Sequence, residues 1–153
     1  MALATERSTG SARYRYRPMS GFNPERVAEL FEADAYAKAM GIELISVDDT
    51  EVVVALDVEA RHLNFLGGGH GGMLFSLADC AFSLASNSAG PIAVAIDTHL
   101  VLTAAAREGT RLTATATEQT RGRTVGTYHV KVVRDDGRVA GLFTGTVHIS
   151  AES

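Results

Sequence analysis

The stretch NFLGGGHGGMLFSLADCAFSLASN, residues 64–87, decides the fold of this chain. Its glycine-rich beginning predicts a turn, and the apolar residues that follow predict one long helix from residue 71 to about residue 88. Residues at helical spacing make one apolar stripe: Leu74, Leu77, Ala78, Ala81, Leu84 and Ala85. The other faces are also small or apolar, so we expect a helix buried nearly all round, ended by Gly90-Pro91.

Alternating patterns on both sides of this helix predict strands. Two precede it, residues 42–47 and 52–58, joined at a hairpin by Asp48-Asp49-Thr50. Four more follow it: residues 92–102, 111–117, 125–133 and 138–149, with a hairpin turn at Asp135-Asp136-Gly137 before the last. One helix and about six antiparallel strands predict an α+β fold in which the sheet wraps around the helix. Dimerisation that extends the sheet would protect its edges.

The N-terminal part divides at Asn23. Residues 1–22 are polar with little apolar periodicity, which predicts a flexible tail. Asn23 before Pro24 is typical of a helix N-cap, and the helix that follows is expected to break near Asp34 and to stop at Gly41. Residues 23–153 are therefore predicted to form a single domain.

Asp79 is the most unusual residue of the long helix. It stands among Leu77, Ala78, Cys80 and Ala81, although Asp is a poor residue for a helix interior and an unpaired buried carboxylate is costly. Either the carboxylate is paired structurally or it faces a cleft and acts on a substrate. Partial burial would raise its pKa and strengthen it as a general base or nucleophile.

The residues before the helix are candidates for substrate binding. Gly71 and Gly72 place backbone N–H groups at the positive end of the helix dipole, where a carbonyl oxygen can approach closely. A flexible loop leading into a helix is the alternative interpretation. His70 and Asn64 would be a structural hydrogen-bonding group and a turn residue if taken singly, but together with Asp79 they bring donors and a base into one segment.

Composition excludes several classes of protein. The 153 residues are 46% hydrophobic and 21% charged, with a net charge of −4 and a pI near 5.7, which argues against nucleic-acid binding. No apolar run reaches the roughly 18 residues that a membrane helix needs, and we expect no secretory signal. The single cysteine, Cys80, favours a reducing compartment, so we expect a cytoplasmic protein.

Other kinds of site lack their motifs. No spacing of histidines, carboxylates or cysteine is typical of a metal site, and we expect no cofactor. The chain has no GxSxG elbow, no phosphate-binding GxxxxGK[ST] loop and no GxGxxG after a strand.

The segment from Asn64 through His70-Gly71-Gly72 to Asp79 resembles the hotdog-fold thioesterase superfamily, and within it the PaaI-type branch of phenylacetic acid degradation. The resemblance extends over residues 31–149. It implies a homodimer, often paired into a tetramer, that hydrolyses acyl-CoA. It also implies a site between subunits, in which Asn64 and Gly71 of one chain face Asp79 of the other. His70 would orient the loop, Asn64 would position substrate or water, and Asp79 would activate water or attack the carbonyl.

The resemblance also suggests how the rest of the substrate is held. Cationic residues near the cleft would bind the CoA phosphates, and the residues at the family position are Arg121, Arg123 and Thr124, with Arg61 and Arg107 as weaker options. A solvated hairpin turn is their alternative role. Apolar residues that would line an acyl pocket, or simply pack in the core, are Phe65, Met73, Leu74 and Phe82.

One departure from the family pattern keeps other functions open. Relatives often carry Ser or Thr on the strand after the helix, where this chain has Ala95, and Thr98 lies farther along. A non-catalytic acyl-CoA sensor is therefore one alternative, and a hotdog enoyl-CoA hydratase or dehydratase is another. A small aryl-acetyl or short-to-medium acyl group is implied by the resemblance alone.

Overall fold

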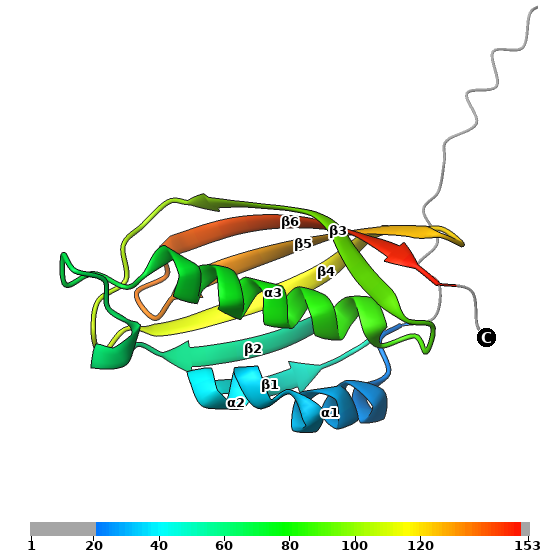
Figure 1. The fold of residues 1–153 in the computed structure, drawn as a ribbon, viewed down its shortest axis with the longest axis horizontal. Coiled ribbons are helices and arrows are strands. Elements are labelled where there is room, and N and C mark those ends of the chain that lie inside the picture. The colour runs from blue at the N-terminus through cyan, green and yellow to red at the C-terminus, as the bar shows by residue number, and fades with distance from the viewer. Residues whose placement is uncertain (1–20, 151–153) are drawn as a thin grey trace, which may run out of the picture.

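The computed structural model describes residues 21–150, which form one antiparallel sheet with a long helix lying across it (Figure 1). The strands are β1 (Ile42–Val47), β2 (Glu51–Asp57), β3 (Ala93–Leu102), β4 (Arg111–Arg121), β5 (Val125–Arg134) and β6 (Val139–Ile149). The helices are α1 (Pro24–Ala33), α2 (Ala35–Met40) and α3 (Gly71–Asn87), with a short 3-10 turn, η1 (Ala60–His62). The sheet order is β1-β2-β4-β5-β6-β3, so the predicted α+β arrangement is confirmed.

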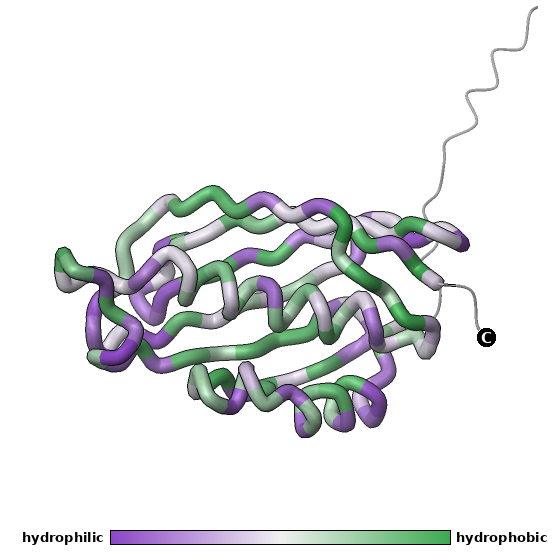
Figure 2. The backbone as a smooth tube through the Cα atoms, viewed as in Figure 1, coloured by the Kyte–Doolittle hydropathy of each residue, from purple (hydrophilic) through white to green (hydrophobic). Residues whose placement is uncertain are grey.

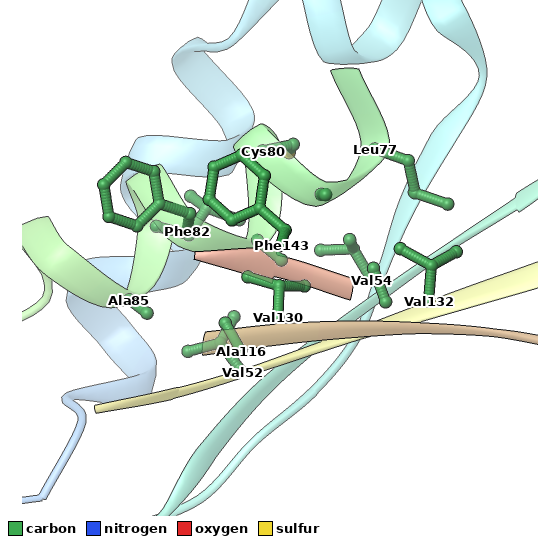
Figure 3. Close-up of a cluster of buried hydrophobic side chains, with 14 of the residues drawn as sticks. Val52, Val54, Leu77, Cys80, Phe82, Ala85, Ala116, Val130, Val132 and Phe143 are labelled. Carbon is green, nitrogen blue, oxygen red and sulfur yellow. The ribbon is translucent and has the colours of Figure 1, made fainter. Parts of the chain in front are cut away.

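The core lies between α3 and the sheet. Phe82 of α3 is fully buried, and it lies beside Phe143 in the core (Figure 3). The centroid of its ring is 5.4 Å from that of Phe143 and 5.7 Å from that of Tyr128. A Cβ on Gly145 would lie only 2.7 Å from the Phe82 ring, so a glycine is needed where β6 passes beneath α3. These contacts fix the helix against the strands and make it the rigid support of the site.

The two short N-terminal helices follow from their caps. The Asn23 side chain accepts a hydrogen bond from the Arg26 N–H at 3.2 Å, and Asp34 accepts one from the Ala37 N–H at 2.9 Å. Asp34 thus ends α1 and begins α2, which confirms the predicted break. Gly41 ends α2 with φ at +76°, a left-handed conformation that favours glycine.

The boundary predicted for the N-terminal tail needs one correction. The sequence predicts that Phe22 belongs to the tail, but its side chain is buried in the hydrophobic core. Burying a large aromatic side chain stabilises the fold even where the neighbouring residues show no apolar periodicity. The packed domain therefore includes Phe22, while residues 1–20 lie outside the described part of the chain.

One strand, β4, is clearly longer than the alternating pattern alone indicates. β4 continues through four further residues to Arg121, because polar groups pair across the sheet there. The Thr120 and Thr127 hydroxyls lie 2.7 Å apart, and Tyr128 donates to a Glu118 carboxylate oxygen at 2.9 Å. Figure 2 shows β2 as a nearly continuous hydrophobic stretch, which fits a strand buried on both faces.

β3 is an edge strand with an unusual surface. It pairs only with β6, and most of its residues are exposed although many are apolar. Its exposed apolar side chains are Val94, Ile96, Val101 and Leu102. An apolar, unpaired edge of this kind is typical of a contact surface.

Within residues 21–150, none of the helices combines the length and the apolar character that crossing a membrane requires.

Candidate active site

Asn64 organises the loop that leads into α3. Its side-chain oxygen accepts hydrogen bonds from the Leu66 N–H at 2.9 Å and the Gly68 N–H at 3.2 Å, and its backbone N–H donates to the Gly68 carbonyl at 2.7 Å. The predicted turn role is thus observed. The side-chain NH2 group has no acceptor among residues 21–150, so it is a donor still available to a ligand.

His70 caps the N-terminus of α3. Its Nδ1 accepts a hydrogen bond from the Gly72 N–H at 2.9 Å, so Nδ1 carries no proton and Nε2 carries one in the neutral ring. The His70 carbonyl accepts from the Met73 and Leu74 N–H groups. His70 therefore holds the first turn of the helix in place and accepts from two of its amides that have no regular helical acceptor, those of Gly72 and Met73.

The backbone N–H of Gly71 is the one donor of that turn without a hydrogen-bond acceptor among residues 21–150. This N–H stands at the positive end of α3, where an oxygen that gains negative charge is stabilised. A Cβ at this position would lie 3.1 Å from Leu102 Cδ1, so any side chain here would require Leu102 to shift, whereas glycine leaves this space open.

A cavity of about 360 Å³ lies beside these two donors. It is lined by Asn64, Gly69, Gly71, Leu74, Leu102, Thr103, Ala104, Ala105 and Ala106. Both the Asn64 side chain and the Gly71 backbone border it, while its other walls are mostly aliphatic. A small apolar group bearing a carbonyl at its mouth would match this combination.

Asp79 is half-buried and unpaired. Its carboxylate makes no hydrogen bond or ion pair with any residue between 21 and 150. Burial raises the pKa of the Asp79 carboxyl, and the nearby charge of Asp34 raises it further. Burial would not raise the pKa of an exposed carboxylate, and a carboxylate with a structural role would have a hydrogen-bond or ion-pair partner. The Asp79 carboxylate is therefore suited to accepting a proton or attacking a carbon.

The site residues of one chain do not all meet. Asp79 follows Gly71 by eight residues of α3, a rise of roughly 12 Å along the helix axis. Asp79 does not border the cavity that Asn64 and Gly71 line. Within one chain, the two donors and the carboxylate therefore lie in separate places.

The residues expected to bind CoA have different surroundings in the structure. Arg121 donates through Nη1 to the Ser86 carbonyl at 3.0 Å and to the Tyr128 hydroxyl at 2.6 Å, so this guanidinium is engaged inside the protein. Arg123 and Thr124 are exposed in the β4–β5 turn. Phe82 has the position of a core residue, and the structure favours core packing over substrate contact for its ring.

Three features of the site have no local signal in the sequence. The Tyr36 and Ser76 hydroxyls lie 2.9 Å apart, and Ser76 in turn donates to the Gly72 carbonyl, which ties α2 to α3 one turn before Asp79. The charge of Asp34, at the junction between α1 and α2, acts on Asp79 of α3. The cavity wall from Leu102 to Ala106 comes from the end of β3, more than twenty residues after Asp79.

The buried cysteine is not a further nucleophile. Burial, with smaller effects of Asp34 and Asp79, raises the pKa of the Cys80 thiol to about 12, so it stays protonated at neutral pH. In the part of the chain that the structure describes, no group of three or more His, Cys, Asp or Glu side chains is arranged to hold a metal ion.

Comparison with known proteins identifies the class. A family model for the thioesterase superfamily matches residues 66–140. The acyl-coenzyme A thioesterase PaaI of Escherichia coli is 41% identical over 119 residues, which are 78% of this chain and 85% of that protein. The structure of E. coli PaaI, from the phenylacetic acid degradation operon, matches with a TM-score of 0.81 at 38% identity, covering 84% of this chain and 94% of that chain.

A protein of Streptococcus pneumoniae TIGR4 described as a hypothetical thioesterase, solved with coenzyme A, matches with a TM-score of 0.75 at 27% identity, covering 81% of this chain and 97% of that one. It has also been solved with an Asp and with a Thr replaced by Ala. The chain belongs to the thioesterase superfamily. It is a thioester hydrolase, and its sheet around α3 is the hotdog fold that the sequence resemblance implied.

Proposed function

We propose that this protein hydrolyses small acyl-CoA thioesters, of the aryl-acetyl or short-to-medium type, to a free acid and CoA. The observation that carries the proposal is the free Gly71 N–H at the mouth of an aliphatic cavity. Thioester hydrolysis develops negative charge on the carbonyl oxygen, and a preorganised N–H at a helix N-terminus stabilises that charge. The name of the E. coli relative, an acyl-coenzyme A thioesterase, supports this substrate class.

The complete site is proposed to form between two copies of the chain. The separation of Asp79 from Gly71 along α3 requires a second copy to bring a carboxylate to the cavity. The exposed apolar edge of β3 supplies a surface for that copy, by continuing the sheet. Phe65 and Leu66, 97% and 81% exposed at the tip of the loop before α3, are further apolar groups that a partner would cover. Pairing of dimers into a tetramer stays an expectation.

The proposed chemistry uses groups of this chain and water, without a cofactor. The substrate carbonyl oxygen accepts a hydrogen bond from the Gly71 N–H, and the Asn64 NH2 group orients the thioester or the water. The carboxylate of the partner's Asp79 takes a proton from water, whose oxygen bonds to the carbonyl carbon. The carbon–sulfur bond then breaks, and the thiolate of CoA takes the proton back from the Asp79 carboxyl.

Direct attack by Asp79 is the alternative chemistry. Its carboxylate oxygen would bond to the carbonyl carbon and expel the thiolate of CoA, leaving an anhydride that water then cleaves. Both routes need the ionised carboxylate. For the CoA phosphates, we propose exposed Arg123 in the β4–β5 turn in preference to Arg121, because Arg121 already donates to Ser86 and Tyr128.

Ala95 motivates a second candidate function, acyl-CoA binding without turnover. The Asp and the Thr that were replaced in the Streptococcus pneumoniae thioesterase lie sixteen positions apart, as Asp79 and Ala95 do in this chain. Ala95 has no hydroxyl to hold a water molecule, and Thr98 lies three residues farther along β3. A sensor would bind CoA esters and release no thiol.

The pH dependence of turnover should depend on the charge of Asp34. Replacing Asp34 by Asn keeps the oxygen that caps α2 but removes a negative charge, so the pKa of Asp79 falls toward its ordinary value. Since the ionised carboxylate is the active form, we expect the acid limb of kcat/KM to move to lower pH. Glu29→Gln, which removes an exposed charge from α1, should leave the limb in place. An unmoved acid limb in Asp34→Asn would contradict Asp79 as the titrating group.

The first experiment is thiol release by the native protein from acetyl-, hexanoyl- and phenylacetyl-CoA, with crotonyl-CoA followed for loss of its double bond. We expect thiol release from at least one saturated ester and no hydration of crotonyl-CoA. Binding of these esters by calorimetry without any thiol release would replace hydrolysis by the sensor function. Hydration without thiol release would replace it by a hydratase.

A further inference from the structure

The cavity beside Gly71 has one wall that is held rigidly from three sides. At its beginning, the Thr103 N–H donates to the Ala140 carbonyl at 3.0 Å. At its end, the Ala106 carbonyl accepts from the Gly69 N–H at 2.9 Å. In between, the Arg134 guanidinium at the end of β5 donates to the Ala105 carbonyl. We call residues 102–106 the wall segment, and these bonds fix its distance from the helix N-terminus.

The side chains of the wall segment are aliphatic or already engaged. Leu102 and three alanines, Ala104 to Ala106, contribute only methyl and methylene groups. The Thr103 hydroxyl donates to the Val139 carbonyl at 2.6 Å, so it offers no donor to a ligand. None of the residues that line the cavity is Lys, Arg or His. A carboxylate placed there would lose its water without gaining a cation from this chain.

The lining of the cavity indicates which end of the substrate enters it. Leu74 and Ala106 are buried, so they form the side of the cavity nearest the core. The nucleotide of CoA carries several negative charges and cannot be buried against aliphatic groups. With the carbonyl oxygen at the Gly71 N–H, the acyl group must therefore point inward and the sulfur outward.

We propose that the wall segment selects the acyl group, with Leu102 and Ala104 as the specificity-determining residues, and that it admits uncharged acyl groups and rejects those ending in a carboxylate. Leu102 lies close to the Gly71 backbone, because its Cδ1 is 3.1 Å from the position that a Cβ on Gly71 would take. Ala104 is half-buried in the wall, where a larger side chain would fill the space. This inference rests on the proposed hydrolysis of acyl-CoA.

The test compares butanoyl-CoA with succinyl-CoA, which has the same chain length but ends in a carboxylate. For the native protein we expect kcat/KM to be on the order of 100-fold higher for butanoyl-CoA, since the buried carboxylate has no cation to pair with. Equal turnover of the two esters would overturn the proposal.

Two substitutions test the wall directly through the ratio of kcat/KM for phenylacetyl-CoA to that for acetyl-CoA. Leu102→Ala should raise this ratio about tenfold by enlarging the cavity, and Ala104→Leu should lower it about tenfold by filling it. Leu142→Ala is the matched control, because Leu142 is similarly exposed but lies on the outer face of the sheet, where its change should alter the ratio less than twofold. If Ala104→Leu lowers the melting temperature, Ala104→Val replaces it as a variant that adds less volume to the cavity.

Calorimetric binding of the same four esters distinguishes a failure of the wall from a failure of hydrolysis. Selective binding that follows the substitutions, without any thiol release, would support the wall and remove the enzymatic function. The opposite outcome is turnover with a kcat/KM ratio that stays the same in Leu102→Ala and in both Ala104 variants. That result would contradict the role of the wall segment and keep the enzymatic function.

Discussion

Asp79→Asn is expected to lower kcat for acyl-CoA hydrolysis by about 100-fold or more, with KM changed only a few-fold. The amide has nearly the shape of the carboxylate, but it can neither accept a proton from water nor attack the carbonyl carbon. Since Asp79 makes no hydrogen bond within residues 21–150, the substitution breaks no internal contact. Asp49→Asn, in the exposed β1–β2 turn, is the control and should retain native turnover.

The same substitution is expected to raise the melting temperature at neutral pH. The pKa of Asp79 is higher in the folded protein than in the unfolded chain, so ionisation favours unfolding, and stability falls as pH rises through this interval. Asparagine removes that effect. A variant that is more stable yet inactive would show that the carboxylate serves the reaction rather than the fold. Native turnover in Asp79→Asn would remove Asp79 from the mechanism, and His70 would become the next residue to test.

The parts of the fold that sequence predicts well are those with local causes. The helix begins at Gly71 because glycines and His70 supply a turn and a cap within a few residues. Asp34 breaks the N-terminal helix for the same reason, since its carboxylate accepts from an amide three residues later. The unusual place of Asp79 in an apolar helix is likewise visible from its neighbours.

The parts that sequence does not predict depend on contacts between distant segments. The charge of Asp34 reaches Asp79 only because α1 and α2 fold back onto α3. Residues 102–106 show no pattern of their own, and they become a cavity wall only when β3 ends opposite the N-terminus of α3. No spacing rule connects segments that are brought together by the whole sheet.

Arg121 shows why side-chain roles are harder to predict than elements. A basic residue in a hairpin turn is typical of an anion site, but its guanidinium turns inward to the end of α3 and to Tyr128, whose hydroxyl donates to Glu118. The position of the residue was clear from the turn, whereas the direction of its side chain depends on partners in other strands. The β4–β5 turn still leaves Arg123 exposed for a phosphate.

Asn64→Asp is expected to lower kcat/KM by on the order of 100-fold without unfolding the loop before α3. Aspartate keeps the oxygen that accepts from the Leu66 and Gly68 N–H groups, but it loses the NH2 group and places a negative charge near the developing oxyanion. An unchanged melting temperature would show that the loop is intact. Native turnover in this variant would exclude the Asn64 NH2 group from the reaction.

This variant also allows the strongest test of a site shared between two chains. A dimer that combines one Asn64→Asp chain with one Asp79→Asn chain, isolated through different affinity tags, would contain one intact site and one site with both changes. We expect about half of the native turnover per dimer, although each variant alone is lowered about 100-fold. The control dimer joins a chain carrying both substitutions to an unaltered chain and should be about as weak as the single variants, because each of its sites has one altered residue. If Asn64 and Asp79 of the same chain acted together, the two results would be reversed.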